Sequence, residues 1–469
     1  MRKLHTINRL FTASFFKSLI MIALPVSLQN LFLSMINMAD NIMIGQLGDV
    51  PIAAVGLSNQ IFFVFVLIVF GISTASAIFT AQYWGSKDVF MIKKVQGLSL
   101  ILSGVASIIF GTMTLLIPEI LLSLYTKDSQ VIITGASYMR ITGFCYLFTG
   151  GSISMSLIMR TVKRPFVPLI GSAVSMFINI SINWLLIFGN LGFPCLGVRG
   201  AAIGTLIARI VEFLVIVISV YYGKYPNAGT FKEMFHFHRK FLLKFFKTAT
   251  PVILNESVWV LGMTSYSIIY GRISTEAVAS YEIANSLVQV AFIFYMGTAN
   301  ASSVMIGNRL GYGSIRSAVI TAYRFVILAP IMGVFIGIGY YLMSGVLPSL
   351  FMVSDTTQMM IRDLMIALAI IIPIKGLNLH LIVGIFRSGG DTRFSLMLDI
   401  GSIWLIGIPL AFFCGWVLKL PVYAVFLISN SEEIIKAIIG IMRLRSRLWT
   451  NVLTDKLSLK NVPTSDYGI

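Results

Sequence analysis

The sequence predicts an all-α membrane protein with twelve transmembrane helices, arranged as two six-helix bundles related by a pseudo-two-fold axis. Three observations lead to this prediction: the apolar composition, the length and number of the apolar runs, and one internal repeat. Of the 469 residues, 57% are hydrophobic and only 11% are charged, and the mean hydropathy is +0.89. Soluble domains carry about 25% charged residues, so this composition indicates a chain that lies in lipid.

Apolar runs long enough to span a bilayer, about 20 residues each, recur along the whole chain. Backbone polar groups find no water in lipid, so we expect each run to be a helix, and the alternating pattern of a membrane barrel is absent from the sequence. The twelve expected spans are 16–44, 53–80, 95–117, 131–157, 166–188, 199–221, 242–270, 278–305, 318–346, 358–384, 394–417 and 421–441.

The chain repeats itself once, at an offset of 226 residues that needs no gap over the first two spans. The matched pairs include Pro25 with Pro251, Gly45 with Gly271, Gly71 with Gly297, Gly85 with Gly311 and, at an offset of 227, Arg160 with Arg387. Each half holds six spans, so both halves enter the membrane in the same direction. The sequence therefore predicts a parallel repeat, and substrate sites in such transporters lie between the two halves.

The repeat and the charges define the expected segments and their orientation. We expect an N-terminal six-helix lobe at 1–222, a cytoplasmic linker at 223–240, a C-terminal six-helix lobe at 241–441 and a cytoplasmic polar tail at 442–469. Of the 35 Lys and Arg residues, 25 lie on the side of the termini and 5 on the other side. This bias predicts cytoplasmic termini in a multi-pass protein of the plasma (inner) membrane, and it explains much of the net charge without nucleic-acid binding.

The stretch NMADNIMIG, residues 37–45, places a carboxylate inside an apolar span. Ionisable groups in a membrane are costly and are functional by default, so Asp40 is the first candidate for an ion or substrate site. Asn37 and Asn41 lie beside it in the sequence. Asn179 and Asn183 are one turn apart on the fifth span, and we expect them to be neighbours of Asp40. For the asparagines, hydrogen bonding between packed helices is an equally good interpretation.

Four more of the charged residues inside spans are candidates for the site: Glu256, Glu282, Lys375 and Asp399. None of the candidate acids recurs at its repeat position: Asp40 aligns with Tyr266, Glu256 with Asn30, Glu282 with Gly56 and Asp399 with Ser172. An acid that the fold required would tend to occur in both halves, so this pattern favours a chemical role. We expect these residues to line the cleft between the halves together with Asp40.

Lys375 has two interpretations. It can form a salt bridge with Glu256 or Glu282 that makes a buried acid tolerable, or it can supply a charge that drives off a proton or substrate during transport. The first is favoured, because buried charges are generally paired.

A second set of charged residues has helical spacing: Arg209 with Glu212, and Glu432 and Glu433 with Lys436. Side chains three or four residues apart meet on one helix face, so we expect these residues to pair along their own helices and to be structural.

Taken together, several motifs resemble the multidrug and toxic compound extrusion (MATE) family, in its NorM-like and DinF-like branches. The stretches are PVSLQ, NMADNIMIGQLG followed by AAVGLSNQ, MRTVKRPFVPLIGSAVSMFINISINWLLIFG, GVRGAAIGTLIAR and FRSGGDTRFSLMLDIGSIW. The resemblance extends to about residue 441. It implies a secondary antiporter that exports organic, often cationic compounds in exchange for H⁺ or Na⁺ by alternating access. It also implies that Asp40 is the family's first-helix acid and Glu256 the seventh-helix acid of the NorM-like branch.

Two departures from the family bear on the coupling ion. The tenth span carries Lys375, and no acid lies from Leu364 to Phe386, where sodium-coupled NorM-like members have one. The fifth span has Asn183 where archaeal DinF-like members have an aspartate. We therefore favour H⁺ over Na⁺, while Na⁺ near Asp40 or Glu256 remains the alternative. A proton and an organic cation can compete for one buried carboxyl group, which is the simplest antiport.

Other function classes fit less well. A lipid-linked oligosaccharide flippase of the same superfamily is the alternative, but it would need several Arg or Lys side chains to hold pyrophosphate, and the intramembrane acids oppose an anionic cargo. The sequence contains no filter-like repeat, no HExxH and no Walker motif, so neither a channel nor an enzyme is expected. The expected partners are small organic molecules and the lipid bilayer, with no cofactor beyond the coupling ion, and we expect a monomer.

Overall fold

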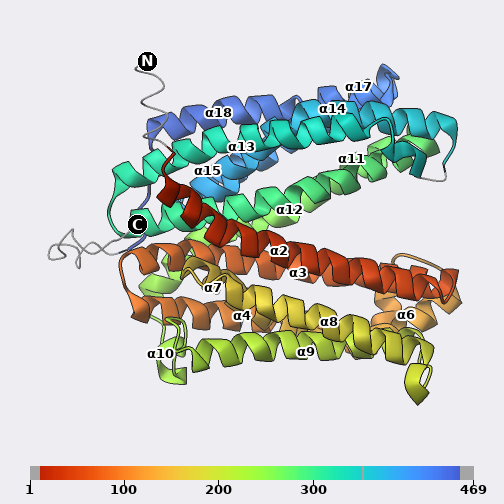
Figure 1. Ribbon diagram of the computed structural model, residues 1–469, viewed down its shortest axis with the longest axis horizontal. Helices are drawn as coiled ribbons and strands as arrows, with labels where there is room; N and C mark the ends of the chain where they lie inside the picture. Colours follow the sequence, from red (N-terminus) through yellow and green to blue (C-terminus); the bar gives the residue numbers. More distant parts are fainter. Residues whose placement is uncertain (1–10, 351–352, 455–469) are drawn as a thin grey trace. The chain divides into compact units, whose positions relative to one another are not determined.

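The computed structural model describes residues 11–350 and 353–454 (Figure 1). Every regular element in these residues is a helix, so the all-α prediction is confirmed. In this part of the chain, ten helices are long and apolar enough to cross a membrane. An eleventh span comes from the pair α6 (Ser129–Thr142) and α7 (Cys145–Thr161), which bend by 54° where they meet.

The chain forms two compact units. The N-terminal unit comprises residues 25–84 and 88–245, and the C-terminal unit comprises residues 11–24, residues 85–87 and the described residues from Phe246 onward. The division differs from the predicted lobes at both ends of the first half. The described residues up to Leu24 group with the C-terminal unit, and the predicted linker 223–240 groups with the N-terminal unit.

The first helix of each half is shared between the units. Helix α2 (Ala13–Gly45) passes from one unit to the other at Pro25, and α11 (Arg239–Gly271) does so at Phe246. In the C-terminal unit, the ring of Phe15 packs edge-on against Phe325 at 5.4 Å between centroids. In the N-terminal unit, Phe245 stacks on Phe79 at 5.5 Å. Each unit therefore includes the opening turns of the helix that begins the other half.

The N-terminal unit continues from α2 through eight further α-helices. They are α3 (Asp49–Gly85), α4 (Val89–Leu116), α5 (Pro118–Ser123), α6, α7, α8 (Phe166–Phe188), α9 (Val198–Tyr222) and the short α10 (Phe231–Phe235). Helices α8 and α9 run side by side (Figure 1). Helix α8 stops at Gly189, whose φ of +71° is a left-handed conformation that glycine adopts without steric cost.

The C-terminal unit consists mainly of α11 and the helices that follow it. These are α12 (Thr275–Gly311), α13 (Ile315–Met343), α14 (Asp355–Leu379), α15 (Thr392–Ser402), α16 (Ile408–Phe412), α17 (Val422–Ser429) and α18 (Glu432–Ser446). Three π-helical turns interrupt the series, at His380–Phe386, Ile403–Gly407 and Phe413–Val417. Such turns often occur at functional sites. Helices α13 and α14 lie side by side (Figure 1), and both contact the first of the three turns.

The twelfth expected span, 421–441, is not one continuous helix. It is divided between α17 and α18, which are separated at Asn430 and Ser431. The predicted polar tail begins at residue 442, yet α18 continues to Ser446 and the Trp449 side chain is fully buried. Residues 455–469 of that tail lie outside the described residues.

The linker is anchored to the N-terminal unit through α10. Thr230 and Glu233 form a capping box at the start of α10, and the Lys93 ammonium lies 2.9 Å from the Glu233 carboxylate. Asn227 also donates a hydrogen bond to Gln96. The backbone N–H of Thr230 and the charge of Lys93 lower the pKa of Glu233 from 4.5 to about 2. The linker is therefore packed against α4.

Candidate functional site in the N-terminal unit and its counterpart

Asp40 lies in a polar cluster of the N-terminal unit formed by α2, α8 and α9. The side-chain amide of Asn183 donates to Asp40 Oδ1 at 2.5 Å. Asn183 is fully buried, whereas Asp40 is half-buried. A Cβ atom at Gly204 of α9 would overlap the Asn183 side-chain oxygen, so only glycine at this position lets Asn183 lie here. The predicted proximity of Asn183 to Asp40 is confirmed.

The cluster extends from Asn183 along α8 to α9. Asn183 also approaches Asn179 at 3.4 Å, and Asn179 in turn approaches the Thr205 hydroxyl at 3.5 Å. The side-chain oxygen of Asn183 is buried and accepts no hydrogen bond within the described residues. Arg209 of α9 interacts electrostatically with Asp40. The acid therefore has an amide donor and a nearby cation among helices that are long and apolar enough to cross a membrane.

Asn37 and Asn41 do not join this cluster. Both side chains are exposed on α2, although they are close to Asp40 in sequence. Glu282 is likewise exposed, and it accepts a hydrogen bond from Ser267 at 2.7 Å.

A second polar network lies in the same unit and was not anticipated from the sequence. Arg160 of α7 donates to Gln29 of α2 at 2.7 Å, and Gln29 donates to Ser172 of α8 at 3.1 Å. Ser172 donates to Glu212 of α9 at 2.8 Å, and Arg209 pairs with Glu212 at 2.8 Å. The predicted pairing of Arg209 with Glu212 along one helix is confirmed. The network joins four helices through buried side chains.

In the C-terminal unit, Glu256 of α11 is paired with an arginine. Arg387 lies 2.5 Å from the Glu256 carboxylate, and its side chain is only 3% exposed. The expectation that Lys375 bridges to Glu256 or Glu282 is therefore wrong. Lys375 of α14 lies 3.5 Å from Glu433 of α18 instead. Periodicity shows which helix face carries Lys375, but it does not show which helix that face meets.

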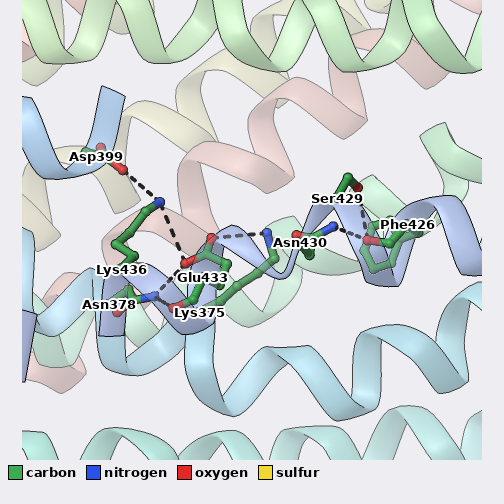
Figure 2. A network of polar contacts seen from close by, with 8 residues as sticks. All are labelled: Lys375, Asn378, Asp399, Phe426, Ser429, Asn430, Glu433 and Lys436. Atoms are coloured by element: carbon green, nitrogen blue, oxygen red, sulfur yellow. Dashed lines mark hydrogen bonds and ion pairs between the residues drawn. The ribbon is translucent and has the colours of Figure 1, made fainter. Parts of the chain in front are cut away.

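Asp399 and Lys375 belong to one ionic network of α14, α15 and α18 (Figure 2). Lys436 lies 3.1 Å from Asp399 and 3.7 Å from Glu433. Asn378 donates to both the backbone and the side-chain oxygens of Glu433, each at 2.7 Å. The pairing of Glu433 with Lys436 along their helix is confirmed, but the same residues also connect three helices. We call this network the ionic cluster.

The nine sequence candidates thus fall into separate groups. Asp40, Asn179 and Asn183 lie together in one unit, and Lys375 and Asp399 share the ionic cluster in the other. Glu256 pairs separately. Asn255 of α11 also donates to Asp399, at 3.0 Å. The partners that the sequence did not predict are Gln29, Arg160, Ser172, Asn255, Asn378 and Arg387. The repeat contained a signal for some of them, since it aligned Arg160 with Arg387 and Ser172 with Asp399.

The sequence matches one family model and several known transporters. The family model described as MatE matches residues 25–185 and 251–413. The transporter YisQ of Bacillus subtilis, named as uncharacterized, is 24% identical over 437 residues, which cover 92% of this chain and 94% of YisQ. A probable multidrug resistance protein NorM of Thermotoga maritima is 23% identical, with 84% of this chain and 85% of NorM covered.

Solved structures extend the match to the fold. A crystal structure of MATE in a straight conformation has a TM-score of 0.83 at 18% identity, covering 92% of this chain and 96% of that one. A transporter of the MOP superfamily from Pyrococcus furiosus has a TM-score of 0.80 at 20% identity, with the same coverage. This likeness confirms the predicted twelve-helix fold with two bundles.

Proposed function

This chain belongs to the MatE family, and on that premise we propose that it exports organic, mainly cationic compounds from the cell in exchange for H⁺ by alternating access. Relatives named as multidrug resistance proteins support the export of small molecules. The observation that carries the proposal is Asp40, a carboxyl group held by Asn183 among helices long and apolar enough to cross a membrane. In this proposal Asp40 is the exchange site.

The chemistry of the exchange follows from the surroundings of Asp40. A carboxyl group in a low-dielectric setting is more stable when protonated, whereas an incoming organic cation favours the carboxylate. Proton and substrate therefore compete for one group. The amide of Asn183 can donate to the carboxylate, and its unpaired oxygen can accept from the protonated acid after a rotation. Asn183 thus serves both states of Asp40.

Two observations support H⁺ as the coupling ion. Glu256 is already paired with Arg387, so a cation bound there would have to compete with a guanidinium group. Among the described residues, α14 supplies Lys375 and Asn378 to the ionic cluster, and no acid. Sodium sites need several oxygen ligands, and a lysine opposes them.

The orientation completes the proposal. The positive-inside bias supports cytoplasmic termini in the plasma membrane. Asp40 lies near the end of α2, far along a 33-residue helix that starts on the cytoplasmic side, so it lies toward the outer surface. From there it can receive protons from outside and release them when a cation arrives from within. The flippase alternative is not favoured, because the same site would repel an anionic cargo.

Transport in proteoliposomes tests this proposal. The purified chain is reconstituted with a fluorescent organic cation, and ΔpH and ΔNa⁺ are imposed separately. We expect ΔpH to drive transport, and we expect Asp40→Asn to abolish this coupling at an unchanged protein level. Asp49→Asn, a change at an exposed acid at the start of α3, is the matched control. Transport driven by ΔNa⁺ at zero ΔpH would contradict H⁺ coupling, and wild-type ΔpH-driven transport by Asp40→Asn would contradict Asp40 as the exchange site.

A further inference from the structure

Glu432 is a buried carboxyl group that the proposed exchange site does not use. It is the first residue of α18, and it is 4% exposed. Its Oε2 atom is buried and has no hydrogen-bond partner within the described part of the chain. An ionised carboxylate inside a protein needs partners, and without them the neutral acid is far more stable.

The charges around Glu432 do not balance if every acid is ionised. Lys375, Asp399, Glu433 and Lys436 of the ionic cluster all interact electrostatically with it. Both lysines are already engaged, Lys436 with Asp399 and Glu433, and Lys375 with Glu433. With Glu432 included, the cluster holds three carboxyl groups and two ammonium groups. One carboxyl group is in excess, and Glu432 is the one without a bonded partner.

Two further titratable groups lie on elements near Glu432: His380 on the π-helical turn that contacts α18, and Tyr266 on α11. His380, in the π-helical turn that follows α14, is fully buried and bonded to a backbone carbonyl of α14 and to a threonine of α12. Tyr266 of α11 comes close to Glu432 at Gly407. A Cβ atom placed on Gly407 would overlap the Tyr266 hydroxyl and lie 3.1 Å from the Glu432 carboxyl carbon.

The internal repeat relates the position of Glu432 to that of Asp40. Tyr266 is the residue that aligns with Asp40 at the offset of 226. Where the N-terminal unit has an aspartate on its first helix, the C-terminal unit has a tyrosine, and a carboxyl group reaches the same neighbourhood from α18 instead. Glu432 therefore lies beside the C-terminal counterpart of the exchange site, supplied by a different helix.

We propose that Glu432 carries a proton in the resting protein and is a second proton-binding site, located in the C-terminal unit. The proton neutralises the excess carboxyl group of the ionic cluster. It leaves when Lys375 or Lys436 is released from its acid and becomes available to Glu432. Its coupling to transport rests on the proposed function, whereas its presence at rest does not.

The two sites together would change the energetics of exchange. One H⁺ exchanged for one monovalent cation moves no net charge across the membrane. If Glu432 adds a second H⁺, each cycle carries one positive charge inward, and the membrane potential contributes to export. The equilibrium substrate gradient then shifts about tenfold for about 59 mV of imposed potential.

Infrared difference spectroscopy on the purified full-length protein tests the resting proton. At neutral pH, the carbonyl stretch of protonated carboxyl groups should lose one component in Glu432→Gln, which keeps the size of the neutral acid. Asp399→Asn should lose the same component, because two acids then match two lysines and Glu432 can ionise. Glu119→Gln, at an exposed acid paired with Arg140, should leave the spectrum unchanged. Identical spectra for wild type and Glu432→Gln, at equal amounts of folded protein, would overturn the proposal.

The spectra also separate this inference from the exchange-site proposal. Loss of a component in Glu432→Gln but none in Asp40→Asn would support the second site and count against a resting proton on Asp40. Transport then tests the coupling. An inside-negative potential should shift the substrate gradient about tenfold per 59 mV in wild type and should have no effect in Glu432→Gln. A wild-type gradient that ignores the potential would overturn the coupling of Glu432.

Discussion

Each unit connects three helices that are equivalent in the repeat, and the chemistry of the connecting contacts differs between the units. In the N-terminal unit the contacts run from Gln29 through Ser172 to Glu212, and in the C-terminal unit they run from Asn255 through Asp399 to Lys436. The first two members of each series are repeat partners, at offsets of 226 and 227. The repeat therefore preserved the places where helices touch, while the chemistry at those places changed.

The third helix carries the clearest change. Residues 208–212 of α9, ARIVE, correspond to residues 432–436 of α18, EEIIK, at an offset of 224. Arg209 takes the place of Glu433 and Glu212 the place of Lys436, so the pair one turn apart is kept with its signs reversed. The N-terminal unit opposes this pair with a neutral serine, whereas the C-terminal unit opposes it with an aspartate. A neutral hydrogen-bonding group in one unit thus occupies the position that an ion occupies in the other. Mutations at such paired positions should therefore change the stability by different amounts.

The largest difference is expected at the repeat-related arginines. Arg387→Met leaves the Glu256 carboxylate without its partner, which should cost about 3–5 kcal/mol. Arg160→Met removes a donor to the neutral amide of Gln29, which should cost about 1 kcal/mol. Thermal unfolding of both variants in one detergent provides the measurement. Equal losses of stability would mean that the ionic character of the C-terminal contact is unimportant.

At the repeat-related amides on the first helix of each half, the larger loss of stability is expected in the N-terminal unit instead. Gln29 accepts a hydrogen bond from Arg160 and donates one to Ser172. Gln29→Leu leaves the buried guanidinium of Arg160 without its acceptor, which should lower the stability by about 2–3 kcal/mol. Asn255→Leu removes one donor from Asp399, which keeps Lys436, and should cost about 1 kcal/mol. Thermal unfolding of both variants under the same conditions measures the two losses of stability. A larger loss for Asn255→Leu would contradict the prediction that the N-terminal unit depends more strongly on its amide.

Lys375 provides a smaller effect within the ionic cluster. Lys375→Met should cost about 1 kcal/mol and lower the protein level in the membrane slightly, because Glu433 keeps Lys436 and Asn378 as partners. Quantitative immunoblotting of membranes, together with transport, checks this. Normal abundance with abolished transport would instead support a direct part for Lys375 in the transport cycle.

The smallest effect is expected at the ion pair between Lys93 and Glu233 of the linker, which lies outside the expected spans. The pKa of Glu233 is lowered in the folded protein, so its contribution is complete above its ordinary pKa of 4.5 and is lost as pH falls toward about 2. Hydrogen exchange of residues 227–236, corrected for intrinsic rates, should accelerate over that window in wild type. In Glu233→Gln the exchange should already be fast at neutral pH, with the overall unfolding midpoint unchanged. A wild-type linker whose protection does not vary with pH would contradict this.

Much of the fold was predictable because lipid imposes simple rules. Length and apolarity defined most spans, and the two halves were visible from Pro25 and Pro251 in unbroken register. The twelfth span was harder, since three buried charged residues interrupt its apolar pattern, and those charges are stable only because α14 and α15 supply partners. The residues of such a span show its charges, but they do not show which helices compensate those charges.

The candidate site was predictable in part for the same reason. Asn179 and Asn183 share a helix face, and the asparagine cluster with Asp40 followed from that. The partners of Glu256 and Lys375 depend on how helices are placed against one another, and periodicity carries no information about this placement. Asn41 was a misleading neighbour, because adjacent residues on a helix do not share a face. Asn37 is one turn from Asp40, yet its side chain is exposed.

The sharing of α2 between the units has a consequence for how this protein is made. Its opening turns leave the ribosome before the second half does, yet Phe15 and Leu19 pack in one cluster with Ala301, Val304 and Phe325, hundreds of residues later. Those turns must wait in the bilayer, without their final neighbours, until the second half has been inserted. A truncated chain ending after α10 would lack this packing, so we expect membrane quality control to treat the first half as an unfinished product rather than a stable intermediate.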